Sequence, residues 1–180
     1  RARDDHRWTL FARIPPAPRQ ALLWLPALGV AARHYLPFAD ALAGHGVAVF
    51  LHEWRGNGSS SLRARRGSDW GYRELLVQDI PASQAEMDRL LPSATPLVLG
   101  GHSLGGQLAC CRLALAPGTA DALWLVASGA PYWRTFPMPT RAWLPFAYRF
   151  LPWLARMHGH LPGRRIGFGG NEAAGVIADW

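Results

Sequence analysis

The sequence of 180 residues predicts an α/β fold, in which a mostly parallel β-sheet carries flanking helices. Short apolar runs alternate with helical stretches along the chain, the order typical of β-α-β units. Several of these runs are almost continuously apolar, as expected for strands covered on both faces. One run leads directly into a Gly-x-Ser-x-Gly segment that is followed by a helix pattern, the local order of a strand, a sharp turn and a helix.

The apolar runs define the candidate strands. In chain order these are residues 8–14, 21–28, 47–54, 97–100 and 122–128. Because helical stretches separate most of them, we expect parallel pairing through crossover connections.

Three helices are predicted between the strands. Residues 35–42 form the first, which ends at Gly44-His45-Gly46. Residues 79–91 form the second, with Asp79 as its N-cap, Pro81 in its first turn and apolar residues along one face. The third follows the Gly-x-Ser-x-Gly segment over residues 106–115, and Pro117-Gly118 closes it.

The most specific motif is Gly101-His102-Ser103-Leu104-Gly105, which has the pattern of a nucleophile elbow. The preceding run, residues 96–100, is apolar and suits a strand. Glycines two residues either side of Ser103 let the backbone turn sharply without a Cβ clash. The flanking strand and helix patterns make a surface serine in an ordinary Gly-rich turn the less favoured interpretation.

The composition of the chain changes over residues 132–161, where aromatic residues are interspersed with prolines and arginines. Aromatics and arginines together also suit an interfacial membrane helix, but Pro145 and Pro152 predict that no long helix forms. We favour a cap or lid whose aromatics face an apolar acyl or alkyl pocket. The domain division is therefore residues 1–131 for the core and residues 132–180 for a cap-like segment and the start of a C-terminal part.

Composition limits the classes of protein. A hydrophobic content of 49% suits one globular domain, and Cys110 and Cys111 are adjacent, which favours small buried packing residues over a disulfide. The net charge of +7 comes from scattered arginines without lysine, which argues against a nucleic-acid partner. No apolar run reaches membrane-spanning length, and the first residues lack the apolar centre of a secretory signal, so the sequence predicts a cytoplasmic protein without an integral membrane segment.

Taken together, the motifs resemble the α/β-hydrolase fold superfamily, and within it bacterial serine hydrolases similar to monoacylglycerol lipases and serine aminopeptidases. Four segments match in the family's order: residues 25–29, residues 53–60, residues 101–106 and residues 127–129. In the second of these segments, Glu53 stands where the family's D-x-R-G-x-G-x-S loop has aspartate.

The resemblance makes Ser103 the nucleophile and Gly101 and Gly105 the structural glycines of the elbow. The chemistry of acyl transfer agrees, because a developing oxyanion needs preorganised N–H donors. The N–H of Leu104, at the start of the elbow helix, is one such donor. Aligning Pro26-Ala27 with the family's usual His-Gly places the second donor on Leu28.

The sequence departs from the family at the acid and the histidine of the triad. After Ser103 the only histidines are His158 and His160, both in the aromatic segment. Asp121 precedes a strand, which puts it at the wrong end of the sheet. Glu172 and Asp179 follow both histidines, so no Ser-acid-His order can be assembled. With about six strands where the family sheet has eight, we expect the triad acid and histidine to be absent from residues 1–180 and to follow Trp180 in a longer protein.

Other histidines are weaker candidates. His102 is next to Ser103, but the resemblance implies a packing role rather than that of a base. His34, His45 and His52 precede the elbow and have the positions of loop or helix-end residues. His158 and His160 are two residues apart with no further ligand at a useful interval, so we expect no metal site and no cofactor.

The leading interpretation is a serine hydrolase, a carboxylic ester hydrolase that works through an acyl-enzyme on Ser103, with residues 1–180 inactive by themselves. The predicted partner is a small-molecule or lipid-like ester, and the sequence leaves the oligomeric state open. Two alternatives remain: a non-catalytic binding protein that keeps the fold, and an acyltransferase that uses the same acyl-enzyme.

Overall fold

The computed structural model describes residue 2 and residues 4–180, and it confirms the α/β prediction. A five-stranded sheet has the order β1-β3-β2-β4-β5. β1 pairs with β3 antiparallel, and the other pairings are parallel. The strands are β1 (Phe11–Arg13), β2 (Gln20–Leu25), β3 (Val47–Leu51), β4 (Leu97–His102) and β5 (Ala122–Val126).

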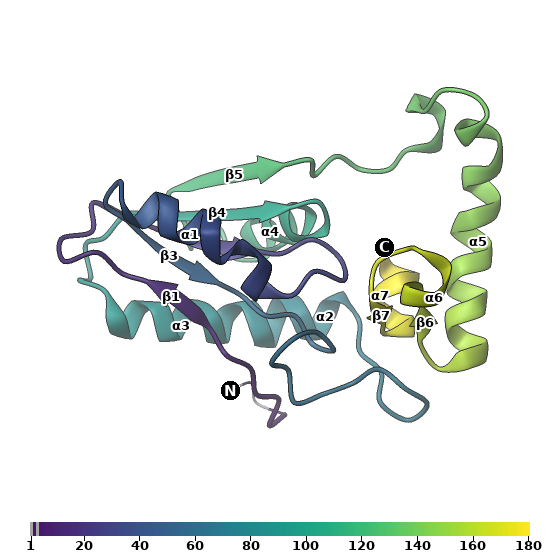
Figure 1. The fold of residues 1–180 in the computed structure, drawn as a ribbon, viewed down its shortest axis with the longest axis horizontal. Helices are drawn as coiled ribbons and strands as arrows, with labels where there is room; N and C mark the ends of the chain where they lie inside the picture. The colour runs from purple at the N-terminus through teal and green to yellow at the C-terminus, as the bar shows by residue number, and fades with distance from the viewer. Residues whose placement is uncertain (1, 3) are drawn as a thin grey trace.

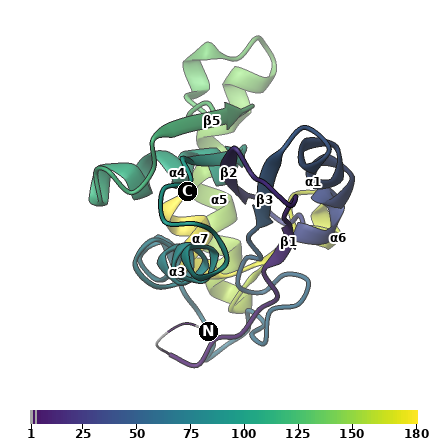
Figure 2. The same ribbon diagram turned by 90° about the vertical axis from the view of Figure 1, so that its left-hand side faces the viewer.

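Helices cover both faces of this sheet (Figures 1 and 2). A short 3₁₀ helix, η1 (Ala32–Tyr35), leads into α1 (Leu36–Ala43), which packs on the face that presents Leu22, Trp24 and Val49. On the other face, α3 (Ile80–Leu90) and α4 (Leu104–Leu115) pack against Leu23 and Phe50. The alternation of side chains along β2 therefore supplies both apolar layers.

The strands differ in burial. β2 after its first residue and all of β3 are buried, as their apolar sequences predict. β5 is equally apolar but lies at the sheet edge, and every one of its residues is exposed. The apolar sequence of β5 predicts a buried strand, but no other element buries β5 within residues 2 and 4–180.

The second predicted helix begins earlier than expected. Helical backbone runs from α2 (Tyr72–Glu74) through the π-helical turn η2 (Leu75–Asp79) into α3. Glu74 caps the start, since its side chain accepts the Gly71 N–H at 2.9 Å. The prediction of Asp79 as N-cap was wrong: Asp79 has helical dihedrals, and its carboxylate is used in a buried ion pair instead.

The segment after β5 contains η3 (Trp133–Thr135), α5 (Thr140–His158), α6 (Gly163–Ile166), α7 (Ala174–Asp179) and the small hairpin of β6 (Leu161–Pro162) and β7 (Asn171–Glu172). The prediction that Pro145 and Pro152 interrupt any long helix was wrong, because α5 is continuous over 19 residues. The prolines are seven residues apart and share one side of the helix, while buried Ala147 and Ala155 lie on a face that packs on α7 and β6. This packing offsets the lost backbone hydrogen bonds.

The structure also bears on the two cysteines and on the absence of a membrane-spanning segment, both considered from the sequence. Cys110 is exposed rather than buried, whereas Cys111 packs partly against the core. Within the described residues no helix has the combination of length and hydropathy needed to cross a bilayer.

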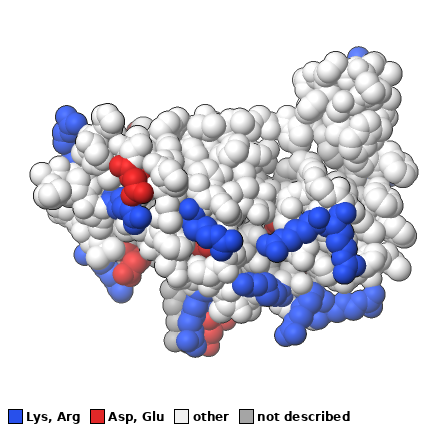
Figure 3. Space-filling view, in the orientation of Figure 1, with Lys and Arg blue, Asp and Glu red and all other residues white. Residues whose placement is uncertain are grey.

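Arginines are spread over the visible face in Figure 3, as the sequence indicates. Acidic side chains lie close to several of them at the left and centre of this view. The right-hand end, which holds α5 in Figure 1, shows arginines without an acidic side chain on this face.

Candidate active site

Ser103 lies between the last residue of β4 and the first residue of α4, and its backbone is strained. Its φ is +52° and its ψ is −117°, a combination that non-glycine residues adopt rarely. The surrounding backbone holds this geometry: the Ser103 N–H donates to Val126 O at 2.9 Å, and the Ser103 carbonyl accepts the N–H of Gly106 at 3.1 Å. The side chain is half-buried at the carboxyl edge of the sheet.

The elbow glycines are required by close backbone contacts. A Cβ on Gly101 would overlap the backbone of Gly105, and a Cβ on Gly105 would overlap the Leu25 carbonyl group. The end of β2 and the first turn of α4 therefore touch without intervening side chains. Since Leu25 is paired with Gly101 across β2 and β4, the residues after Leu25 and Ser103 emerge at the same edge of the sheet.

Two backbone N–H groups near this edge have the properties of oxyanion donors. Leu104 is the first residue of α4, so its N–H has no acceptor within the helix, and the helix dipole favours negative charge there. Leu28 follows β2 and is half-buried, and its N–H has no hydrogen-bond acceptor among the described residues. The neighbouring Ala27 N–H is occupied, because it donates to Tyr35 Oη at 3.1 Å.

Tyr35 links the loop after β2 to the elbow. Its hydroxyl lies 3.0 Å from His102 Nδ1, and since this oxygen already accepts the Ala27 N–H, its own proton is free for the imidazole. Burial raises the pKa of Tyr35, which keeps the hydroxyl protonated. Neither His102 nor any other histidine in residues 2 and 4–180 forms a hydrogen bond with Ser103.

The loop after β3 supports the same edge. Glu53 is buried; one carboxylate oxygen accepts the Ala32 N–H at 3.0 Å and the other accepts the Ser59 N–H at 3.1 Å. Trp54 donates its indole N–H to Pro26 O at 2.8 Å. Glu53 thus folds its own loop onto η1, and Trp54 ties that loop to the segment that carries Leu28.

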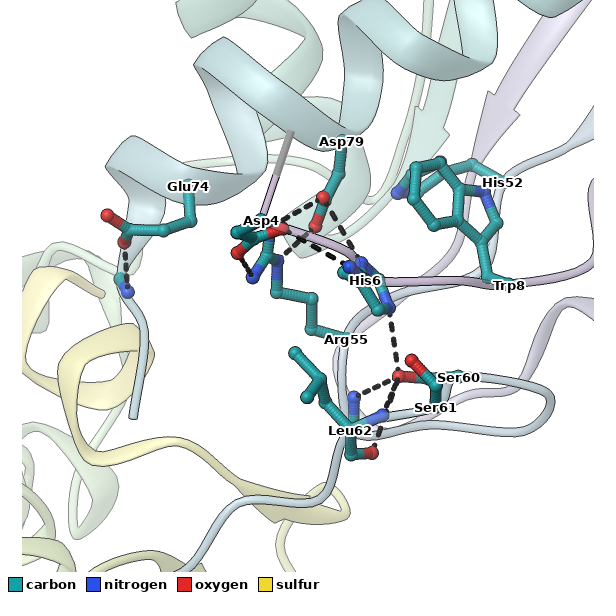
Figure 4. A network of polar contacts seen from close by, with 12 residues as sticks. Asp4, His6, Trp8, His52, Arg55, Ser60, Ser61, Leu62, Glu74 and Asp79 are labelled. Atoms are coloured by element: carbon teal, nitrogen blue, oxygen red, sulfur yellow. Dashed lines mark hydrogen bonds and ion pairs between the residues drawn. The ribbon is translucent and has the colours of Figure 1, made fainter. Parts of the chain in front are cut away.

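A buried polar network contains a serine, a histidine and an aspartate, but it is not the candidate active site (Figure 4). His6 lies with Nδ1 3.2 Å from Asp79 Oδ1 and Nε2 3.0 Å from Ser60 Oγ. His6 and Asp79 are completely buried, and Ser60 Oγ is saturated by the N–H groups of Gly56 and Leu62, both at 3.1 Å. No substrate carbonyl can reach this hydroxyl.

The network instead joins three segments of the chain. Arg55 pairs with Asp79 through Nε at 2.6 Å and Nη2 at 2.8 Å, and it reaches Asp4 at 2.5 Å. The hydrogen bond to Arg55 lowers the pKa of Asp4. Sequence reasoning missed this cluster because its members come from the N-terminal segment, the loop after β3 and the helix before α3, with no local motif that joins them.

Glu172 lies behind the loop that carries Leu28. Gly29 has a φ of +74°, and a Cβ at this position would overlap the backbone N of Gly170. The Gly170 N–H in turn donates to Glu172 Oε1 at 3.1 Å. Burial raises the pKa of Glu172 to about 7, against the opposing influence of the Gly170 N–H, Arg164 and Asn57. The sequence order leaves Glu172 without a place in a triad, yet burial brings its pKa close to neutrality.

Several other histidines and acids considered from the sequence form hydrogen bonds with groups other than Ser103. His158 Nδ1 is 3.0 Å from Leu154 O at the end of α5, and His45 Nδ1 is 2.8 Å from Ala41 O. Asp121 Oδ2 accepts the Leu97 N–H at the start of β4, the end of that strand opposite Ser103. Among the described residues no three side chains of His, Cys, Asp or Glu are grouped as metal ligands would be.

A search against models of protein families matches residues 16–166 to the family described as serine aminopeptidase, S33. A sequence comparison with curated proteins found no significant match.

Solved structures share the fold at low sequence identity. The monoacylglycerol lipase of Paleococcus ferrophilus is 16% identical with a TM-score of 0.65, over 95% of this chain and 68% of the lipase. An α/β hydrolase of Novosphingobium aromaticivorans is 25% identical with a TM-score of 0.61, over 84% of this chain and 49% of that protein. Est1E of Butyrivibrio proteoclasticus, solved with ferulic acid, is 19% identical with a TM-score of 0.56, over 67% and 48%. The chain therefore spans from about half to about two thirds of these proteins' lengths.

The mostly parallel sheet, the strained serine between β4 and α4 and these structural similarities define an α/β-hydrolase fold. Within that fold class, the chain belongs to the serine aminopeptidase S33 family, whose model covers most of its length.

Gly105→Ala tests the contact between β2 and α4. The added Cβ would overlap the Leu25 carbonyl group, so we expect the variant to lose roughly 3 kcal/mol or more of unfolding free energy in urea titrations. Gly129→Ala is the matched control, because a Cβ there meets nothing within 4 Å. Equal stability of the two variants would contradict the contact.

Asp79→Asn tests the buried network. Without the carboxylate charge, the Arg55 guanidinium, whose side chain is 2% exposed, keeps only its ion pair with Asp4, and we expect a loss of about 3–5 kcal/mol in the same titration. Asp88→Asn, an exposed position on α3, should change stability by less than about 0.5 kcal/mol. A loss at Asp79 no larger than at Asp88 would show that the network does not stabilise the fold.

Glu172→Gln tests the buried acid through pH. The folded protein raises the pKa of Glu172 from 4.5 to about 7, so ionisation opposes folding, and stability is lost as pH rises between these values. Glutamine keeps the acceptor for the Gly170 N–H but does not ionise. We expect its stability advantage over the native protein to grow by roughly 2–3 kcal/mol from pH 5 to pH 8. Exposed Glu86→Gln serves as control, and a pH-independent difference at Glu172 would refute the raised pKa.

Proposed function

We propose that this chain is part of a serine hydrolase that cleaves carboxylic esters through an acyl-enzyme on Ser103. The observation that carries the proposal is the strained backbone of Ser103 at the strand-to-helix turn, beside the unoccupied N–H groups of Leu104 and Leu28. Backbone strain at a polar residue is typical of functional sites. A merely structural serine has no need of it.

In the proposed reaction Ser103 Oγ attacks the ester carbonyl carbon while its proton passes to a histidine base. The carbonyl oxygen becomes an oxyanion, and the N–H groups of Leu104 and Leu28 donate hydrogen bonds to it. Collapse of this intermediate breaks the bond to the alcohol oxygen, which takes the proton from the histidine. Water then attacks the acyl-enzyme by the same route and releases the acid and free Ser103.

The base and the triad acid belong, in this proposal, to a part of the protein outside residues 1–180. No histidine of the described residues forms a hydrogen bond with Ser103, and the chain spans only part of the proteins that share its fold. Removing the base of a Ser-His-Asp triad costs on the order of 10⁴- to 10⁶-fold in rate, so residues 1–180 alone should turn over very little substrate.

An ester with an apolar acyl group suits the surroundings of the candidate donors. Leu28 packs against the buried cluster of Ala155, Leu161, Ala174 and Ile177 in the cap-like segment, so apolar side chains border the position that would bind the carbonyl group. The similar structures include a monoacylglycerol lipase, which supports ester chemistry, and Est1E with bound ferulic acid.

A fluorophosphonate probe applied to the full-length protein should label Ser103, because the phosphonyl group reacts with an activated serine and mimics the tetrahedral intermediate. We expect Ser103→Ala to lose the label while keeping its circular dichroism spectrum. Mass spectrometry of the labelled peptide identifies the residue.

Ser93→Ala is the matched control, since Ser93 is an exposed serine in the loop before β4 and should label as the native protein does. Labelling that persists in a folded Ser103→Ala variant would refute Ser103 as nucleophile. A folded native protein that never reacts would favour a non-catalytic member of the fold.

A further inference from the structure

Helix α5 carries a row of exposed apolar side chains, here called the α5 stripe. Its members follow one another at intervals of three and four residues, which places them along one side of the helix. The stripe consists of Trp143, Phe146, Phe150, Trp153 and Met157, with exposed fractions of 54%, 68%, 40%, 54% and 52%.

The stripe is separate from the side of α5 that holds the helix in place. Ala147 and Ala155 are buried, and Leu151 and Leu154 pack in the cluster that contains Leu161 and Ile177. In contrast, the stripe's rings contact one another: Phe146 stacks on Phe150 with centroids 5.7 Å apart, and Phe150 meets Trp153 at 5.7 Å. Residues 1–180 therefore hold α5 through one side and leave the stripe uncovered on another.

An exposed row of this size needs an explanation. Leaving one such side chain in water rather than burying it forgoes roughly 1.5–3 kcal/mol. Single exposed apolar residues are ordinary, but a continuous row along a helix indicates a contact surface.

The charges around the stripe point to the chemistry of the partner. Residues 122–171 contain six arginines and no aspartate or glutamate, so they carry +6 of the formal net charge of +7. Arg149 and Arg156 are seven residues apart and share the side of α5 that borders the stripe. A partner for this face therefore has apolar groups and negative charge next to each other.

A second copy of the chain does not meet this requirement. Two α5 stripes packed together would bring arginine-rich surfaces close to each other, and residues 122–171 offer no carboxylate to pair with them. Anionic lipid supplies both components, because apolar side chains enter the acyl boundary while arginines bind the phosphate groups above it. Tryptophan also prefers the interface between headgroups and acyl chains.

We propose that the α5 stripe and its flanking arginines dock the protein on an anionic lipid surface, with α5 lying in the plane of the interface. The helix is amphipathic and too polar to cross a bilayer, which suits this orientation. This docking is independent of the chemistry at Ser103.

Sedimentation of the full-length protein with vesicles tests the proposal. We expect binding to vesicles of phosphatidylcholine mixed with phosphatidylglycerol, and much weaker binding to phosphatidylcholine alone. The double variant Phe146→Ser with Trp153→Ser should bind the mixed vesicles at least about tenfold more weakly, because two large apolar side chains are removed. Leu90→Ser with Leu115→Ser is the matched control, since these leucines are 51% and 60% exposed on α3 and α4.

The charge component has its own pair of variants. Arg149→Gln with Arg156→Gln should weaken binding by about fivefold for each arginine removed. Arg73→Gln with Arg89→Gln removes the same charge from α2 and α3 and should have a smaller effect. High salt should weaken binding of the native protein, because it screens the arginines from the headgroups.

Two outcomes would overturn the proposal. The first is native protein that fails to sediment with mixed vesicles, or sediments equally well after the stripe is changed. The second is a native oligomer in light scattering that the stripe variant converts to monomers, which would make the stripe a protein interface. Circular dichroism of each variant verifies that α5 still folds, and none of these readouts requires hydrolytic activity.

Discussion

The direct backbone contact between the end of β2 and the first turn of α4 is the constraint on which the candidate site depends. Side chains cannot fit between Leu25 and Gly105, or between Gly101 and Gly105, so the strand and the helix meet at the distance that glycine alone permits. This contact brings the loop that carries Leu28 to the edge where Ser103 turns. The strain at Ser103 is sustained by its neighbours: Val126 accepts its N–H, and the first turn of α4 donates to its carbonyl.

Three consecutive residues after β3 support that contact from the other side. Glu53 binds the backbone of η1 and of its own loop, Trp54 binds Pro26, and Arg55 forms the buried pair with Asp79. Each side chain therefore ties a different segment to one loop. Burying so many polar groups is costly unless each has a partner, and these have partners that were far away in the chain before folding.

The segment after β5 completes the surroundings of the loop at Leu28. Gly29 lies against the backbone of Gly170, Leu28 lies beside Gly169, and Glu172 is buried next to this contact with its pKa near neutrality. The backbone that would stabilise an oxyanion is thus positioned partly by residues from a distant part of the chain. The same segment carries the α5 stripe, so the proposed lipid contact and the support of the Leu28 loop come from one stretch of the chain.

Local apolar runs, turn glycines and a short motif were enough to predict the α/β class, the positions of the sheet strands along the chain and the position of the elbow. The family's segments also led to Ser103, Leu104 and Leu28 as candidates, whose roles await experiment. The remaining features depend on contacts between segments that are distant in the chain. The sequence predicts Asp79 as a helix cap, but in the folded protein its carboxylate pairs with Arg55 and His6. The sequence also predicts that Pro145 and Pro152 break a helix, but the packing of Ala147 and Ala155 stabilises a continuous α5. Pairings between distant segments have no local signature, so the chain must fold before they exist.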